Sequence, residues 1–455
     1  MAPFTLFDFQ RRIRRTYKFL PRRRLPRAWR FVNRILLVVL LVWITTSLVR
    51  CFSDSGTPST TGQPSTIKSL EATHGEEPST SGNDDNIGEE SEEDTGEAAD
   101  SAPISDVSDP NAESAAPEKF EPNYQRDTIL GQKINQVLAQ YRPYAAFVLM
   151  VDLGSNEILA WGQRTDSTQQ SEPTWLSKSS FPAASLIKMV TSTAALESGR
   201  YGSDTPIPLI GRSVTLYSRQ LRVPENYKGP TITLLDAFAK SCNPAMGFIG
   251  KHLGGRTLRK YGMRMGFERP WPNGTPQPSR FSPPDTGFAL AEAASGFTRV
   301  NTVSPLHMAA IVRALIKKEP LQMPWSHTIP PQFAPRESLP LGNSEFSPDT
   351  YFSMRELFLR TVSHGTARKW MRRTLYSQNH DALWIGGKTG SLDGVDPTGR
   401  YDWFAGFAQS KKQSNKGVVI LVMQVHNKIR TLPSPAVAGL LINTWTKRLG
   451  PPPKK

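Results

Sequence analysis

The sequence predicts an α+β domain in which one antiparallel sheet packs against a helical cluster, preceded by one transmembrane helix and a disordered linker. Two observations favour this class. Apolar runs typical of buried strands occur at both ends of the globular part, and helical patterns fill its middle. An uncharged run near the N-terminus is separated from the globular part by a long stretch that is almost free of apolar side chains.

The N-terminal 50 residues carry the pattern of a membrane anchor. Residues 1–34 hold eleven Arg or Lys and one Asp, and residues 35–49 carry no charge. A membrane span needs about 20 residues, and flanking arginines that reach the interface make up the difference. The positive-inside rule then predicts a cytoplasmic basic tail over 1–34 and a transmembrane anchor over 35–50. A cleaved signal peptide is the alternative, but no Ala-x-Ala-like site follows.

Residues 51–118 are predicted to be an acidic, disordered linker. Between 53 and 117 there are sixteen acids and one Lys, and too few apolar side chains to offset the entropy cost of folding. We expect this linker to tether the domain at 119–450. Residues 118–455 hold 42 basic and 23 acidic residues, a net +19. No nucleic-acid partner is expected, because the most basic run lies beside the apolar run and is better explained as a topology signal.

Apolar periodicity predicts the elements of the domain in order. A helix over 127–141 comes first, followed by a buried strand over 145–152 and its hairpin partner over 157–162. A long apolar helix is predicted over 184–197. Further helices are expected near 234–253, 305–317 and 351–362. Strands over 384–388, 403–408 and 417–425 and a final helix over 435–448 complete the domain.

Three short motifs follow one another along this domain: Ser185-Leu186-Ile187-Lys188, Ser241-Cys242-Asn243 and Lys388-Thr389-Gly390. Residues i and i+3 share one face of a helix, so Lys188 is expected to reach Ser185 and, as a neutral amine, to take its hydroxyl proton. Burial beside Lys388 and the helix start is expected to lower the pKa of Lys188. Free backbone N–H groups at a helix start favour negative charge developing next to Ser185.

The second and third motifs are expected to contact a substrate. Ser241 and Asn243 fit a loop between helices, with a hydroxyl to relay protons and an amide to hold a peptide group. Lys388 to Gly390 are expected at the end of an apolar strand, where glycine permits close approach of a substrate backbone. A bound acyl chain would lie along that edge as an added strand.

Each motif alone is weak evidence for a catalytic site. Residues 65–68 match the first motif within the linker, and residues 377–379 match the second but lie close to the third. The ordered set, each on the expected type of element, is specific. His307 and His364 are interpreted as structural histidines, and three aromatic residues as strand core: Trp384, Trp403 and Phe404.

With these motifs the sequence resembles the transpeptidase domain of penicillin-binding proteins, within the serine β-lactamase and D,D-peptidase superfamily. It resembles the transpeptidase half of the bifunctional members. The resemblance covers roughly residues 140–445 and extends to four further segments: 145–162, 294–309, 364–368 and 402–407.

The resemblance implies a role for each motif residue. Ser185 would be the nucleophile, Lys188 the base and Ser241 the proton shuttle. The implied substrate contacts are Asn243, and Lys388, Thr389, Gly390 and Ser391, which hold a terminal carboxylate. Backbone N–H groups of Ser185 and Ser391 would form the oxyanion hole. No cofactor or metal is implied, and Cys51 and Cys242 are expected to be free thiols.

The implied activity is peptidoglycan D,D-transpeptidation of stem peptides through a serine acyl-enzyme, with β-lactams as covalent inhibitors. Three alternatives remain. A D,D-carboxypeptidase would use water in the second step. A β-lactamase-like hydrolase is disfavoured by the lack of a Glu-x-x-Leu-Asn pattern after Ser241, and a non-catalytic penicillin-binding scaffold by the intact motifs.

The expected location is the bacterial cytoplasmic (inner) membrane, crossed once, with the N-terminus in the cytoplasm and the catalytic domain extracytoplasmic. Because only the anchor and the linker are expected before the domain, a separate glycosyltransferase is the expected source of glycan strands.

Overall fold

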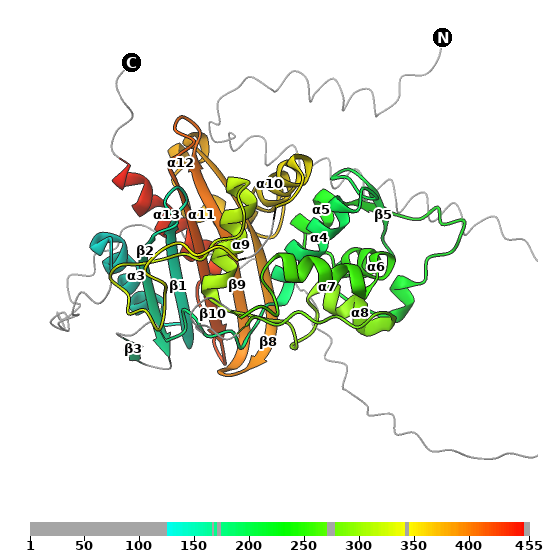
Figure 1. Cartoon of the computed structure of the whole chain (residues 1–455), viewed down its shortest axis with the longest axis horizontal. Coiled ribbons are helices and arrows are strands. Elements are labelled where there is room, and N and C mark those ends of the chain that lie inside the picture. Colours follow the sequence, from blue (N-terminus) through cyan, green and yellow to red (C-terminus); the bar gives the residue numbers. More distant parts are fainter. Residues whose placement is uncertain (1–124, 166–167, 171–173, 271–277, 342–344, 450–455) are drawn as a thin grey trace, which may run out of the picture. The chain divides into compact units, whose positions relative to one another are not determined.

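The computed structural model describes residues 125–165, 168–170, 174–270, 278–341 and 345–449 (Figure 1). The predicted tail over 1–34, the anchor over 35–50 and the linker over 51–118 lie outside these ranges. Within them, no helix is both long and apolar enough to cross a bilayer.

Six antiparallel strands form the main sheet, in the order β3-β2-β1-β10-β9-β8. Their bounds are β1 (Ala145–Asp152), β2 (Ile158–Thr165), β3 (Thr168–Gln170), β8 (Leu383–Val395), β9 (Thr398–Ser410) and β10 (Gly417–His426). Strand β1 pairs with β10 from Ala145 opposite Val425 to Asp152 opposite Val418. The first and last strands of the domain therefore meet inside the sheet. Two short ladders pair β4 (Phe181–Pro182) with β7 (Thr302–Val303) and β5 (Pro206–Pro208) with β6 (Thr231–Thr233).

The helices lie mostly between β2 and β8 in the chain. They are α3 (Thr128–Tyr141), η1 (Ala184–Ile187), α4 (Lys188–Glu197), η2 (Ser218–Leu221), α5 (Leu234–Ala239), α6 (Asn243–Leu253), α7 (Gly255–Arg264), α8 (Gly287–Ser295), α9 (Pro305–Lys317), α10 (Pro348–Ser363), α11 (Arg368–Thr374), α12 (Ser377–Ala382) and α13 (Ser434–Arg448).

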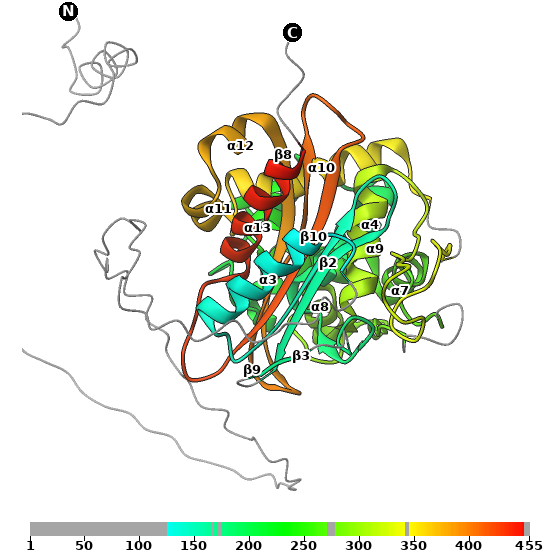
Figure 2. The same ribbon diagram turned by 90° about the vertical axis from the view of Figure 1, so that its left-hand side faces the viewer.

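Both faces of the sheet are covered by helices. Side chains alternate along β1, so Phe147 and Leu149 join one hydrophobic cluster while Val148 and Met150 join another. The first cluster contains residues of α4 to α10, and the second contains residues of α3, α11 and α13. Figure 2 shows α3 and α13 on one side of the sheet and α4, α8 and α9 on the other. The predicted α+β class is confirmed, with helices on two faces rather than one.

The third motif lies within a strand and not at its end, which corrects the prediction. Strands β8 and β9 pair residue by residue from Leu383 opposite Ser410 to Val395 opposite Thr398. The polar residues after Gly390 concealed this continuation, because β8 is the edge strand and part of it needs no apolar side chains.

The predicted aromatic core is only partly right. Trp403 and Phe404 are fully buried on β9, as expected. Trp384 is 45% exposed, so its interpretation as strand core is wrong. It lies on β8, one face of which is not covered at this point.

Candidate active site

The first motif spans the junction between η1 and α4. Ser185 lies in the 3₁₀ turn and Lys188 is the first residue of α4. The Lys188 Nζ atom donates a hydrogen bond to Ser185 Oγ at 2.7 Å. The predicted contact is therefore present, although a 3₁₀ turn that begins at Ala184, with φ +48°, replaces the expected α-helical turn. This left-handed residue turns the chain sharply just before the nucleophile.

The amine of Lys188 is fully buried. Besides Ser185, it donates to Asn243 Oδ1 at 2.8 Å and to the Ser295 carbonyl at 2.6 Å. Burial lowers its pKa to about 7, against a smaller raising effect of Cys242. The predicted lowering of the pKa is thus present, and burial is its cause. A lysine that is partly neutral near pH 7, and whose amine is hydrogen-bonded to a serine hydroxyl, can act as a general base toward that hydroxyl.

The second motif begins at a break between α5 and α6. Ser241 has φ +57°, which separates the two helices and leaves its side chain half-buried. The Lys388 Nζ atom donates to Ser241 Oγ at 3.0 Å and to the Thr389 carbonyl at 2.8 Å. Lys388 is fully buried, and burial, together with the positive charge of Lys188, lowers its pKa well below the usual range.

Asn243 connects Lys188 to a neighbouring loop. It is the first residue of α6, where Pro244 follows at a position that needs no N–H donor. Its Oδ1 accepts from Lys188 at 2.8 Å and its Nδ2 donates to the Val214 carbonyl at 2.8 Å. The side chain therefore orients the lysine amine. Its role as a substrate contact stays a prediction.

The third motif runs along the edge of the site on β8. A Cβ atom on Gly390 would lie 3.3 Å from Ala184 Cβ, so the glycine lets β8 approach the nucleophile turn closely. Thr389 is half-buried and Ser391 exposed. The structure thus places all eight predicted residues on η1, α4, the α5–α6 junction and β8, with contacts that link the three motifs.

Three further residues, which contact the motif residues, were not predicted from the sequence. The Thr366 hydroxyl contacts the Thr389 hydroxyl. The Arg400 Nε atom, on β9, donates to Ser391 Oγ at 2.8 Å, and its Nη1 lies 3.3 Å from Asp393 Oδ2. Ser295 provides the carbonyl that holds Lys188. Thr366 and Ser295 lie in two of the segments on which the family resemblance is based. Arg400 has no such signal in the sequence. The pairing of β8 with β9, which places Arg400 opposite Asp393, reveals its position beside the third motif.

The second match to the Ser-x-Asn motif and the buried His307 have structural contacts and lie outside the site. Asn379 of residues 377–379 is buried in α12 and donates to Asn443 Oδ1 at 2.8 Å. His307 is buried, its Nε2 lies 2.6 Å from the Met265 carbonyl, and burial lowers its pKa to about 4. These residues are occupied with packing contacts outside the three-motif site. Residues 65–68 lie outside the described ranges.

Residues 146–438 match the family model of the penicillin-binding protein transpeptidase domain. The chain belongs to this family. In penicillin-binding transpeptidase domains the three motifs occur in the order found here. The match covers every residue of the site described above.

Curated relatives match a shorter stretch of the chain than the family model does. The chain is 29% identical over 150 residues to the peptidoglycan D,D-transpeptidase PbpA of Mycobacterium tuberculosis, covering 30% of this chain and 28% of that protein. It is 27% identical over 174 residues to PbpA of Mycolicibacterium smegmatis, covering 36% and 31%. The chain therefore spans less than a third of the length of these relatives.

Solved structures share the fold. A peptidoglycan glycosyltransferase from Burkholderia ambifaria matches with a TM-score of 0.54 at 16% identity, over 73% of this chain and 99% of that one. The D,D-transpeptidase domain of a peptidoglycan glycosyltransferase from Eggerthella lenta matches with 0.52 at 19% identity, over 71% and 82%. At these identities the likeness concerns the fold alone.

Gly296 is predicted to be essential to the nucleophile turn. It has φ +70°, and a Cβ atom there would lie 1.9 Å from the Ala184 carbonyl oxygen. We expect Gly296→Ala to lower the free energy of unfolding by about 2 kcal/mol or more. Displacement of Ser185 should lower the penicillin acylation rate by about 100-fold. Stopped-flow acylation and thermal unfolding measure the two effects.

Gly199 provides the matched control for Gly296. Its φ is +68°, but nothing lies within 4 Å of the added Cβ. Gly199→Ala should therefore carry the backbone strain without displacing the nucleophile, and it should acylate at the wild-type rate. Equal acylation rates for the two variants would show that contact with Ala184 does not matter.

Proposed function

We propose that this chain is a peptidoglycan D,D-transpeptidase that cross-links stem peptides through an acyl-enzyme on Ser185. One observation carries the proposal: the buried Lys188 amine, with a pKa of about 7, donates to Ser185 Oγ at 2.7 Å. This is a serine paired with a base able to take its proton near neutral pH. The intact motifs argue against a scaffold that has lost its chemistry.

In the first half-reaction, Ser185 Oγ attacks the carbonyl carbon of the D-Ala-D-Ala bond while Lys188 takes the hydroxyl proton. The C–N bond then breaks, and a proton relayed through Ser241 reaches the amine of the leaving D-Ala. Backbone N–H groups of Ser185 and Ser391 would stabilise the oxyanion. In the second half, the amine of a neighbouring stem attacks the ester, an amide forms, and the proton lost by that amine returns to Ser185.

The edge strand β8 provides the surface for the donor peptide. The Thr389 hydroxyl contacts Thr366 and the Ser391 hydroxyl accepts from Arg400, while the buried Lys388 donates to Ser241. A terminal carboxylate is the group that these side chains would hold. A β-lactam presents a carboxylate and a reactive amide in the same arrangement, so we expect covalent inhibition by β-lactams.

We further propose that the domain works outside the bacterial cytoplasmic membrane. The uncharged run over 35–49, with eleven basic residues before it, supports a single-pass anchor with the N-terminus in the cytoplasm. A linker of 65 residues over 53–117 would give a root-mean-square reach of about 45 Å. A separate glycosyltransferase would supply the glycan strands.

Product analysis tests the proposed reaction. Purified protein is incubated with a stem pentapeptide donor and a second stem peptide bearing a free amine. We expect D-Ala release and a cross-linked peptide dimer, both detected by mass spectrometry. Release of D-Ala without dimer would instead identify a D,D-carboxypeptidase. A penicillin adduct that disappears within seconds would identify a β-lactamase-like hydrolase, and no adduct at all a scaffold.

Arg400 is predicted to position the hydroxyl of Ser391. Removing its guanidinium frees Ser391 Oγ from a hydrogen bond of 2.8 Å. We expect Arg400→Gln to lower the second-order rate of penicillin acylation about tenfold, with the pH profile set by Lys188 unchanged. Arg430→Gln, at an exposed arginine, is the control. An unchanged acylation rate for Arg400→Gln would show that Arg400 does not position the Ser391 hydroxyl.

A further inference from the structure

An open cavity of about 690 Å³ lies between α10, α11, α12 and the start of β8. None of the residues that line it belongs to the catalytic site described above. Its apolar floor is formed by five side chains: Leu359, Val362, Leu375, Leu383 and Ile385. A cavity of this size suits a small ligand or an anchoring side chain.

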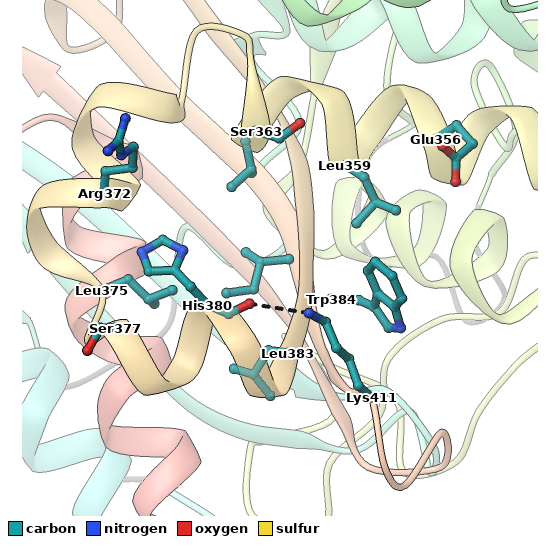
Figure 3. Close-up of a pocket in the computed structure, with 12 residues that line it drawn as sticks. Glu356, Leu359, Ser363, Arg372, Leu375, Ser377, His380, Leu383, Trp384 and Lys411 are labelled. Atoms are coloured by element: carbon teal, nitrogen blue, oxygen red, sulfur yellow. Dashed lines mark hydrogen bonds between the residues drawn. The ribbon is translucent and has the colours of Figure 1, made fainter. Parts of the chain in front are cut away.

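Two cations and one acid, Glu356, line the cavity together with Ser363, Ser377 and His380. Arg372 comes from α11, and Lys411 comes from the turn between β9 and β10. Figure 3 shows the two side chains on opposite sides of His380, with Lys411 Nζ bonded to the His380 carbonyl at 3.3 Å. In the part of the chain that the structure describes, no carboxylate lies within ion-pair distance of Arg372 or Lys411. Neither cation is therefore neutralised by an acid there, and an anionic ligand at Lys411 would add to or replace its contact with the His380 carbonyl.

The surface around the cavity is also positively charged. Helix α11 carries four basic residues and no acid over its seven positions. The β9–β10 turn adds two exposed lysines, Lys412 and Lys416. The nearby acids are Asp381 on α12 and Glu356, which lines the far end of the cavity. In Figure 3, Glu356 lies on the side opposite Arg372. A ligand would therefore place its carboxylates toward Arg372 and away from Glu356.

Two features favour a peptide as the ligand. Leu383 and Ile385 belong to the edge strand β8, where an extended peptide finds main-chain groups to pair with. Trp384, between them, is 45% exposed, and Lys411 Nζ lies 4.8 Å from its ring centroid. Exposed tryptophans beside cations are frequent anchors in protein interfaces.

We propose that this cavity docks an acidic segment of a partner protein. One aliphatic or aromatic side chain of that segment would fill the apolar floor, and its carboxylates would face Arg372 and Lys411. The proposal is independent of the acyl-transfer chemistry, because the lining residues are separate from the catalytic ones.

The test uses the full chain in detergent micelles and a fluorescein-labelled peptide, Asp-Glu-Leu-Glu-Asp-amide, followed by fluorescence anisotropy. We expect saturable binding that weakens as salt rises, because the charges are screened. Arg372→Glu combined with Lys411→Glu should weaken binding about tenfold or more. Replacing the leucine of the peptide by serine should weaken it by a similar factor. Ser363→Trp, which narrows the cavity, should do the same.

Two controls keep the result specific. Arg256→Glu reverses an exposed charge on α7 and should leave peptide binding unchanged. Penicillin acylation should be normal in every variant, which shows that each one is folded. Equal binding of the leucine and serine peptides, or full binding to the Arg372→Glu, Lys411→Glu protein, would overturn the proposal. The proposal would also be overturned if the protein bound phosphatidylglycerol vesicles through Arg372 and Lys411 but did not bind the peptide.

Discussion

Replacing Ser185 by Ala is expected to abolish covalent labelling by penicillin. The acylation rate should fall by a factor on the order of 10⁶, because Ser185 provides the only hydroxyl that hydrogen-bonds the Lys188 amine within the residues that the structure describes. The domain should remain folded, since the side chain is half-buried and a smaller residue fits the turn. Gel fluorescence with a labelled penicillin, together with thermal unfolding, measures both effects.

Ser65→Ala is the control for this experiment. Residues 65–68 repeat the first motif within the predicted linker, so the sequence alone offers two candidate serines. Labelling should be normal in Ser65→Ala. Labelling that survives in Ser185→Ala would show that another residue is the nucleophile.

Lys188→Arg is expected to be nearly as inactive as Lys188→Ala. Arginine keeps a positive charge at position 188, but its guanidinium does not lose a proton under these conditions. The acylation rate should fall about 10³-fold, the contribution of a general base. Lys251→Arg, at an exposed lysine of α6, should be unaffected. Near-UV circular dichroism shows whether the buried guanidinium is tolerated.

The pH dependence of the wild-type protein tests the same base without mutation. Because burial lowers the pKa of Lys188 to about 7, the reactive neutral amine is depleted below that pH. The acylation rate should therefore fall about tenfold for each pH unit below 7 and level off above it. A rate that stays constant from pH 5 to 8, or an active Lys188→Arg variant, would mean that some other group takes the proton.

Much of the site could be predicted because its spacing is local. Ser185 and Lys188 are three positions apart, and one helical turn brings them together whether the turn is 3₁₀ or α. The strands were predictable where burial requires apolar side chains, as in β1 and β10, which have nearly continuous apolar runs.

The rest depends on contacts between distant segments. Ser295 holds Lys188 across 107 positions of sequence, and nothing in its local pattern marks that carbonyl as a partner. Helix α11 escaped prediction because only Met371 of its seven residues is buried, so it has no apolar period. The exposure of Trp384 likewise depends on how β8 lies at the sheet edge, which a strand pattern does not specify.

The most direct test of the central claim is to locate the penicillin adduct by mass spectrometry. The full chain is incubated with benzylpenicillin, sampled over an hour, and digested for peptide mapping. We expect one adduct, on Ser185, that persists for minutes or longer and forms more slowly as pH falls below 7. An adduct on another residue, or no adduct at any pH, would rule out the proposed acyl-enzyme on Ser185.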